Sequence, residues 1–449
     1  MRTLIIVFAI LFISCSSNPE HIKATLAVKN VDIINVRDGS IANDQWVLID
    51  SGNIIKITNQ ELSLSPETKI IDGDGKYLLP GLAEMHAHIP SEIWGGDIMN
   101  TLFLYLSNGV TTIRGMQGHP IHLKLRENAK ANKILSPRIF TSSPGLTGST
   151  VKTPEEADQK IRQYKEDGYD FLKLLPGIKR EVFDQIVATA NEVGIEYAGH
   201  VSTGVGIRHA LQSNYASVDH LDGYLDGLVP ESANVNPHEN GFFGFNFTYL
   251  ADTAKIDELV KMSKEHGVWV VPTQTLFERW YAPGDPEEMA NQPEMKYMPD
   301  DILQGWIDSK KRMVDEDFNV DQWEKFNEIR RKLLLKLHLN GQGLLLGSDA
   351  PQVFNVPGFS IHHELASMIK VGLTPLEAIQ IGTINPAIYF DMEGEFGEVI
   401  ENASADLLLV DENPLENIGA LKKLSGVIVR GRWLSKDDIT EKLNEIATK

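Results

Sequence analysis

The sequence has a single cysteine, Cys15, in 449 residues. One cysteine excludes an intrachain disulfide and any metal site built from several thiolates. A metal site in this chain must therefore use histidine, carboxylate or modified lysine ligands. Positive charge is also scarce, because 42 Lys and Arg stand against 62 Asp and Glu, which gives a formal charge of −20. This balance argues against nucleic acid or an anionic membrane surface as the main partner.

The chain also lacks an apolar run long enough to span a bilayer. Its longest run at the start, Leu4–Ile13, is too short for that and is typical of a signal-peptide core. We predict a signal peptide over residues 1–14 and a polar tether over 15–24. Cys15 follows "FIS" in a lipobox-like position, so we predict a lipid attachment there and a lipid-anchored protein of the bacterial cell envelope. An ordinary secretory signal with an incidental cysteine is the alternative.

Strand-like sequence is found at both ends of the chain. Residues 25–80 and 395–449 show apolar alternation broken by turn dipeptides such as Asp38-Gly39. The first segment is too short to bury a core alone. The economical interpretation is one small β-sandwich domain formed from both termini.

Residues 81–394 alternate strand-like and helix-like segments instead. Candidate strands are 110–115, 137–143, 170–177, 196–202, 217–223, 268–275 and 344–351. Helical patterns cover 154–167, 179–193, 254–266 and 322–340. Glycines suited to a left-handed helix end precede several strands, namely Gly109, Gly168, Gly194, Gly267 and Gly341. Together with the segment around residue 86 this predicts an α/β fold with a (β/α)₈ TIM barrel. A doubly wound open sheet is the alternative, but no glycine-rich phosphate loop follows the first strand.

Two histidines stand one residue apart in "GLAEMHAHIP", residues 81–90. In an extended strand, residues i and i+2 point to the same face, so the imidazoles of His86 and His88 should converge. Two neutral imidazoles at one point suit a divalent metal. A hydrogen-bonded pair with no metal is the simpler explanation for an isolated motif of this kind.

Four further polar residues fall at or just past the ends of other predicted strands: Lys173, His200, His220 and Asp349. Each has an ordinary explanation by itself, such as a buried salt bridge or a loop cap. Lys173 would be costly to bury as a bare ammonium. Because barrel enzymes keep their sites at the carboxyl ends of the strands, six such residues at one end indicate an active site.

Several motifs together resemble the amidohydrolase superfamily, and most closely the imidazolonepropionase-related branch that includes Xaa-Pro dipeptidases. The resemblance spans nearly the whole chain after the signal and rests on "LLPGLAEMHAH", "GVTTIRG", "FLKLLPG", "YAGHVS", "SVDHLDG", "GSDAP", "GLTPLEAIQIGTINPA" and "ADLLLVDENP". One departure is Gly115, where relatives often carry an acidic residue after the arginine. Any supporting role at that position is therefore in doubt.

The resemblance implies two divalent metals, with zinc fitting the nitrogen and oxygen ligands. One metal would be held by His86, His88 and Asp349. The other would be held by His200 and His220, and Lys173, carboxylated by CO₂, would bridge the two. It also implies that a metal-activated water attacks the substrate carbonyl, with Asp349 accepting a proton and passing it to the leaving nitrogen.

The expected function is therefore hydrolysis of an amide C–N bond in a small molecule or dipeptide. A cyclic amide or imide, an ester or a phosphotriester could occupy the same site. A non-catalytic substrate-binding lipoprotein is the hypothesis from another class, and the presence of all six residues argues against it. The only membrane contact expected is the lipid anchor, and association with a second copy of the chain is left open.

Three residues near the predicted rim, Arg114, Tyr224 and His362, are candidate substrate contacts, although a surface helix start would also explain His362. The stretch 282–320 is longer and more acidic than a simple barrel loop. It could be a lid over the site or a solvated helical excursion.

Overall fold

The computed structural model describes residues 22–90 and 97–447. The predicted signal peptide, Cys15 and most of the predicted tether lie outside the described residues. Within these two ranges, every helix is too short or too polar to cross a bilayer.

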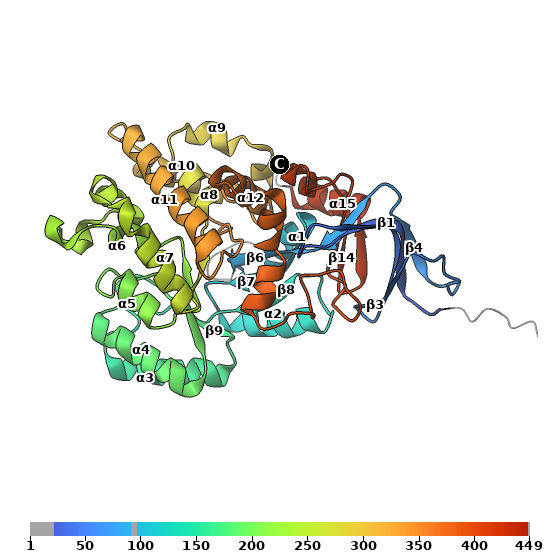
Figure 1. Ribbon diagram of the computed structural model, residues 1–449, viewed down its shortest axis with the longest axis horizontal. Helices are drawn as coiled ribbons and strands as arrows, with labels where there is room; N and C mark the ends of the chain where they lie inside the picture. Colours follow the sequence, from blue (N-terminus) through green and yellow to red (C-terminus); the bar gives the residue numbers. More distant parts are fainter. Residues whose placement is uncertain (1–21, 91–96, 448–449) are drawn as a thin grey trace, which may run out of the picture.

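Strands from both ends of the chain form one eight-stranded sheet, as the blue and red arrows in Figure 1 show. Its order is β15-β14-β13-β5-β1-β2-β3, and β4 pairs with β1. The strands are β1 (Leu26–Ile34), β2 (Ile41–Asp50), β3 (Asn53–Thr58), β4 (Lys69–Asp72), β5 (Tyr77–Pro80), β13 (Leu407–Val410), β14 (Leu424–Val429) and β15 (Arg432–Ser435).

The β-rich ends meet because β5 pairs with β1 on one side and with β13 on the other. Apolar side chains from both ends share one buried cluster, which includes Val28, Val47, Leu407 and Ile428. The cluster is therefore built from both ends of the chain together.

The central residues carry two parallel sheets. One contains β6 (Leu82–Ala87), β7 (Val110–Gly115) and β8 (Arg138–Thr141). The other contains β9 (Phe171–Leu174), β10 (Glu196–Gly199), β11 (Ser217–Asp219) and β12 (Trp269–Val271). Isolated parallel bridges connect the remaining neighbours, at Ser142↔Phe171, Val270↔Leu344 and Ala87↔Ala350. The bridges and ladders together pair eight chain segments in a cyclic order.

Helices follow most of these strands and lie outside the parallel sheets in Figure 1. The α-helices are α1 (Ile98–Ser107), α2 (Pro120–Lys130), α3 (Pro154–Asp167), α4 (Arg180–Val193), α5 (Ile207–Gln212), α6 (Tyr224–Gly227), α7 (Ile256–Glu265), α8 (Gln274–Arg279), α9 (Pro286–Ala290), α10 (Asp300–Met313), α11 (Val320–Asn340), α12 (Phe359–Val371), α13 (Pro375–Gln380), α14 (Ile384–Tyr389) and α15 (Lys436–Ile446). Short 3₁₀ turns are η1 (Glu231–Ala233), η2 (Pro237–Glu239), η3 (Phe242–Leu250), η4 (Thr253–Lys255), η5 (Pro293–Tyr297) and η6 (Ile418–Lys422).

Helix ends follow the sequence signals in most places. In α3, Thr153 caps the start by accepting from the backbone N–H of Glu156 at 3.3 Å, and Gly168 ends the helix with φ of 86°. The prediction of a left-handed residue is wrong for Gly341, whose φ is −86°. Glycine is needed there for a different reason, because a Cβ would lie 2.5 Å from the carbonyl oxygen of Leu337.

The predicted strand over 344–351 is also wrong as a regular strand. The segment makes only isolated bridges, at Leu344 and Ala350, and Asp349 has a left-handed φ of 63°. A Cβ on Gly347 would lie 2.9 Å from the backbone nitrogen of His86, so the chain passes close to β6. The irregular backbone places Asp349 beside the histidines of β6.

Candidate active site

Three predicted ligands converge in the interior. Side-chain ligand atoms of His86, His220 and Asp349 lie within 4.8 Å of one another, and all three residues are buried. His86 comes from the end of β6, His220 follows β11, and Asp349 lies in the irregular segment after Leu344. Three chain segments far apart in sequence therefore deliver nitrogen and oxygen donors to one point.

His88 and His200 lie beside this cluster. His88 Nε2 is 2.6 Å from Asp349 Oδ1, and His86 Nε2 is 3.4 Å from the same oxygen. Both histidines of the β6 motif thus meet one carboxylate, as the i, i+2 spacing predicted. The ring of His200 lies 4.6 Å from that of His220, measured between centroids.

One ring nitrogen of each of two histidines is held by a neighbour. Asp222 Oδ2 lies 2.9 Å from Nδ1 of His200, and Thr273 Oγ1 lies 2.7 Å from Nδ1 of His220, which is also 3.9 Å from Oδ2 of Asp349. Such contacts orient the imidazoles, as is usual around metal-binding histidines.

Lys173 reaches the same interior through a carboxylate. Its Nζ lies 3.5 Å from Oδ2 of Asp219, and that oxygen is 3.0 Å from Nδ1 of His86. Arg114 holds the other oxygen of Asp219 at 3.2 Å. Burial alone would raise the pKa of Asp219, but the charges of Arg114 and Lys173 outweigh it and keep that pKa below its usual range.

The donor set fits a divalent metal on two observations. Nδ1 of His86 is buried without a hydrogen-bond partner among the described residues, since its geometry toward Asp219 is unsuitable despite the short distance. Burial, reinforced by Lys173 for His86 and by His86 for His220, lowers the pKa of both imidazoles well below the usual range. Neutral, incompletely bonded imidazoles beside a carboxylate are suitable metal ligands.

Backbone strain accompanies the cluster. His220, Leu221, Thr273 and Asp349 all have φ between 43° and 64°, although none is glycine. Residues in this region cost free energy and persist only where the surroundings hold them, which is frequent at functional sites. Arg330 contributes to that support, because its Nη1 donates to the carbonyl of His220 at 2.9 Å.

Two buried acids near the candidate ligands, Asp219 and Glu84, were not among the predicted residues. Asp219 precedes His220 directly, and an acid inside an apolar strand was a signal that could have found it. Glu84, two residues before His86, accepts from the backbone N–H groups of His86 at 3.0 Å and Ser348 at 2.7 Å. Glu84 therefore ties β6 to the segment that carries Asp349.

The three candidate substrate contacts do not lie at an open rim. Arg114 is fully buried and donates to Met85, Ser217, Asp219 and Tyr389. Tyr224 is buried, with its hydroxyl 2.6 Å from Oγ of Ser263. His362 is buried on α12 and lines neither the cavity next to His88 nor the cavity next to Trp46. Position near a strand end did not predict that these three side chains are buried.

The buried state of His362 gives a pH prediction. Burial lowers its pKa to about 3, whereas an unfolded histidine titrates near 6.5. The free energy of unfolding is highest above pH 6.5, where His362 is neutral in both states. It falls as the pH drops from 6.5 toward 3, because the unfolded chain binds a proton there that the folded protein does not. From pH 7 to pH 5 the free energy of unfolding should fall by about 2 kcal/mol through this residue. In urea denaturation, the free energy of unfolding of a His362→Gln variant should therefore fall less between pH 7 and pH 5 than that of the wild type, by about 2 kcal/mol.

The control for this measurement is His238→Gln, because His238 is exposed. Equal pH dependence in the wild type and the His362→Gln variant would show that His362 is charged or solvated in the folded protein.

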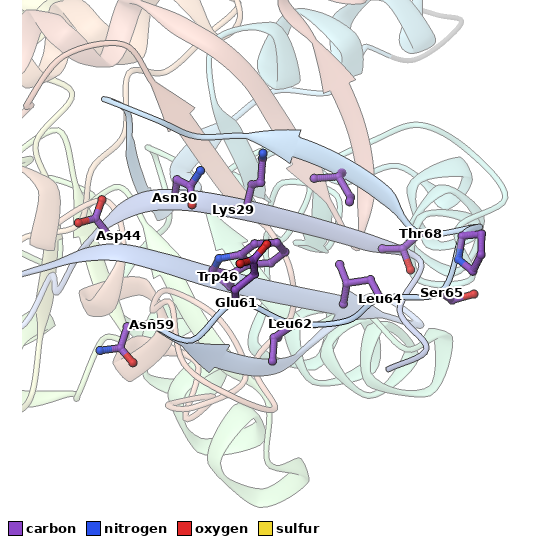
Figure 2. Close-up of a pocket in the computed structure, with 12 residues that line it drawn as sticks. Lys29, Asn30, Asp44, Trp46, Asn59, Glu61, Leu62, Leu64, Ser65 and Thr68 are labelled. Carbon is purple, nitrogen blue, oxygen red and sulfur yellow. The ribbon is translucent and has the colours of Figure 1, made fainter. Parts of the chain in front are cut away.

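A cavity of about 700 Å³ adjoins the cluster at His88. Its wall includes Tyr297, Ile302 and Trp306, which lie within the stretch predicted to be a lid or a solvated excursion. That stretch therefore does contact the cavity that reaches the histidines. Figure 2 shows another cavity, beside the eight-stranded sheet, with Trp46 and Glu61 in its wall. Its volume is about 710 Å³, and none of the six candidate ligands lines it.

Comparison with known proteins identifies the family of the chain. The model of the amidohydrolase family matches residues 77–434, so the chain belongs to the amidohydrolase family. An adenine deaminase of Clostridium botulinum is 21% identical over 437 residues, covering 93% of this chain and 58% of that protein. The chain thus spans a little over half the length of that relative. A dihydroorotase of Bacillus cereus is 23% identical and covers 88% of this chain and 91% of that protein.

Solved structures share the fold. A bottromycin amidohydrolase superposes with a TM-score of 0.70 at 20% identity, covering 94% of this chain and 91% of that one. A Xaa-Pro dipeptidase with bound methionine in its active site superposes with a TM-score of 0.65 at 18% identity, covering 91% and 99%. At these identities the likeness establishes the fold, and the substrate has to be argued from the site.

Proposed function

We propose that this amidohydrolase cleaves an amide C–N bond in a small substrate, with dipeptides as the leading class. The observation that carries the proposal is the convergence of His86, His220 and Asp349 within 4.8 Å, next to a cavity of about 700 Å³. We also propose that the eight segments paired in cyclic order form a (β/α)₈ barrel, and that the terminal strands form a β-sandwich.

The residues that would hold metal follow from their placement. His86, His88 and Asp349 would hold one ion, and His200 and His220 a second. Lys173, as a carbamate, would bridge them, and its buried place in the same interior supports this. Zinc suits these nitrogen and oxygen donors. Bound there, the metal would polarise the substrate carbonyl and lower the pKa of water.

The residues of the chain carry the remaining steps. Asp349 presents carboxylate oxygens beside His86 and His88, in position to accept a proton from water and return it to the leaving nitrogen. Thr273 and Asp222 hold the rings of His220 and His200 in fixed orientations. The ring of Phe243 packs against that of His220, with centroids 5.4 Å apart. The products are a carboxylic acid and an amine.

The second candidate is hydrolysis of a cyclic amide, and the similarity to a dihydroorotase favours it. An ester or phosphotriester substrate, or binding without catalysis, has no such support. The test is a hydrolysis screen of the metal-loaded protein against dipeptides, N-acyl amino acids and lactams. Turnover of linear amides supports the proposal. Turnover confined to lactams would favour the second candidate, and no turnover of any amide would contradict both.

We also propose export and lipid anchoring at Cys15. Changing Cys15 to serine should move the protein from the membrane fraction to the soluble fraction, while its catalytic domain stays folded. The shift should be large, because bacterial lipoproteins carry more than one acyl chain. Fractionation followed by immunoblotting measures it, with Ser16→Ala as the matched control. Unchanged membrane association of the Cys15→Ser variant would contradict the proposal.

A further inference from the structure

The cavity beside His88 has an apolar wall made from three separate parts of the chain. Leu104 comes from α1, Ile302 and Trp306 from α10, and Ile446 from α15. Neither α10 nor α15 contributes any of the six candidate ligands. Their apolar side chains nevertheless lie along the same cavity as His88.

The apolar side chains of this wall pack against other buried side chains. Leu104, Trp306 and Ile446 belong to a buried cluster distinct from the main core, which also contains Phe354. The indole of Trp306 packs edge-on against the Phe354 ring, with centroids 6.0 Å apart. Side chains held by such packing form a preformed surface that needs little ordering when a ligand binds.

The charges of the cavity are equally informative. Among the described residues that line it there is no lysine or arginine, and Asp97 is the one carboxylate. The other polar groups are amides, hydroxyls and imidazoles, including Gln117 and His119. The described wall away from the candidate ligands is therefore nearly uncharged, which suits an apolar side chain.

We infer that the substrate carries a large apolar side chain next to the scissile amide. This inference rests on the proposed function and specifies its substrate class. The apolar side chain would lie against Ile302, Trp306 and Ile446, and the amide would lie toward His88. The wall of α10 and α15 is then the specificity-determining surface of the enzyme.

The experiment uses the full-length, metal-loaded protein and three peptides: Ala-Ala amide, Ala-Phe amide and Phe-Ala amide. Calorimetric titration gives Kd, and chromatography of the mixtures gives kcat/KM where hydrolysis occurs. At least one phenylalanine-containing amide should exceed Ala-Ala amide by about tenfold or more in 1/Kd or kcat/KM. Equal values for all three amides overturn the inference.

Two variants locate the effect on the wall. Trp306→Ala and Ile302→Ala should each reduce the preference for the phenylalanine-containing amide, and Ile302 is half-buried, so its variant keeps the fold intact. Gln304→Ala is the matched control, because Gln304 is exposed on the same helix and does not line the cavity. An unchanged preference in both wall variants overturns the inference. Binding without any hydrolysis would contradict the proposed function. The Kd values would still test the preference for an apolar side chain.

Discussion

An Asp349→Asn variant should lose about two to four orders of magnitude in kcat/KM on the best amide from the screen, because a positioned general base and acid contributes that much. Asparagine keeps the shape of the side chain but cannot accept and return a proton. It also removes the negative charge that His88 meets at 2.6 Å. Steady-state kinetics and a melting temperature on the same preparation measure activity and folding together.

The control for this variant is Asp184→Asn, since Asp184 is half-exposed and pairs with Arg180 and His209 away from the site. Its kcat/KM should equal that of the wild type. If Asp349→Asn retained activity within threefold of the wild type, the proton-transfer role of Asp349 would be wrong.

A Lys173→Ala variant should lose both metal and activity. If Lys173 bridges two ions as a carbamate, its removal leaves a gap that short carboxylic acids can fill, so added acetate should restore part of the metal content and activity. If it is only the cation that pairs with Asp219, metal content should stay the same. In that case stability alone would fall, by less than the roughly 3–5 kcal/mol of a fully broken buried pair, because Arg114 still holds Asp219.

Lys310→Ala is the matched control for a buried lysine. Lys310 is buried and its ammonium donates to the backbone carbonyls of Arg279, Trp280 and Ala282. Its removal should lower the melting temperature and leave the metal content unchanged. A Lys173→Ala protein that behaves in the same way, destabilised with full metal, would refute the carbamate.

Local signals predicted the elements with strong periodicity. The pattern over 154–167 matches α3 to the residue, because Thr153, Pro154 and Gly168 mark both ends. The segment after Leu344 could not be predicted in the same way. Its residues are apolar as in a strand, but the close approach of Gly347 to β6 and the positive φ of Asp349 depend on tertiary contacts.

In the candidate site, too, the sequence predicted the features that depend on local geometry and missed those that depend on tertiary contacts. The spacing of His86 and His88 predicted their shared direction, because the period of an extended strand is local geometry. The placement of Arg114 was not local, since its guanidinium donates to four groups that come from three different segments. Likewise, nothing in the sequence placed Ile446 at the cavity, because the position of α15 depends on the non-local pairing of the strands that precede it.

The most direct test of the account is metal analysis of the folded full-length protein, by mass spectrometry of the element content per mole of chain. We expect close to two divalent ions in the active wild type, and their loss when His86 and His220 are both changed to alanine. An active wild type that holds no metal above trace, or a double variant that keeps the full metal content, would contradict it.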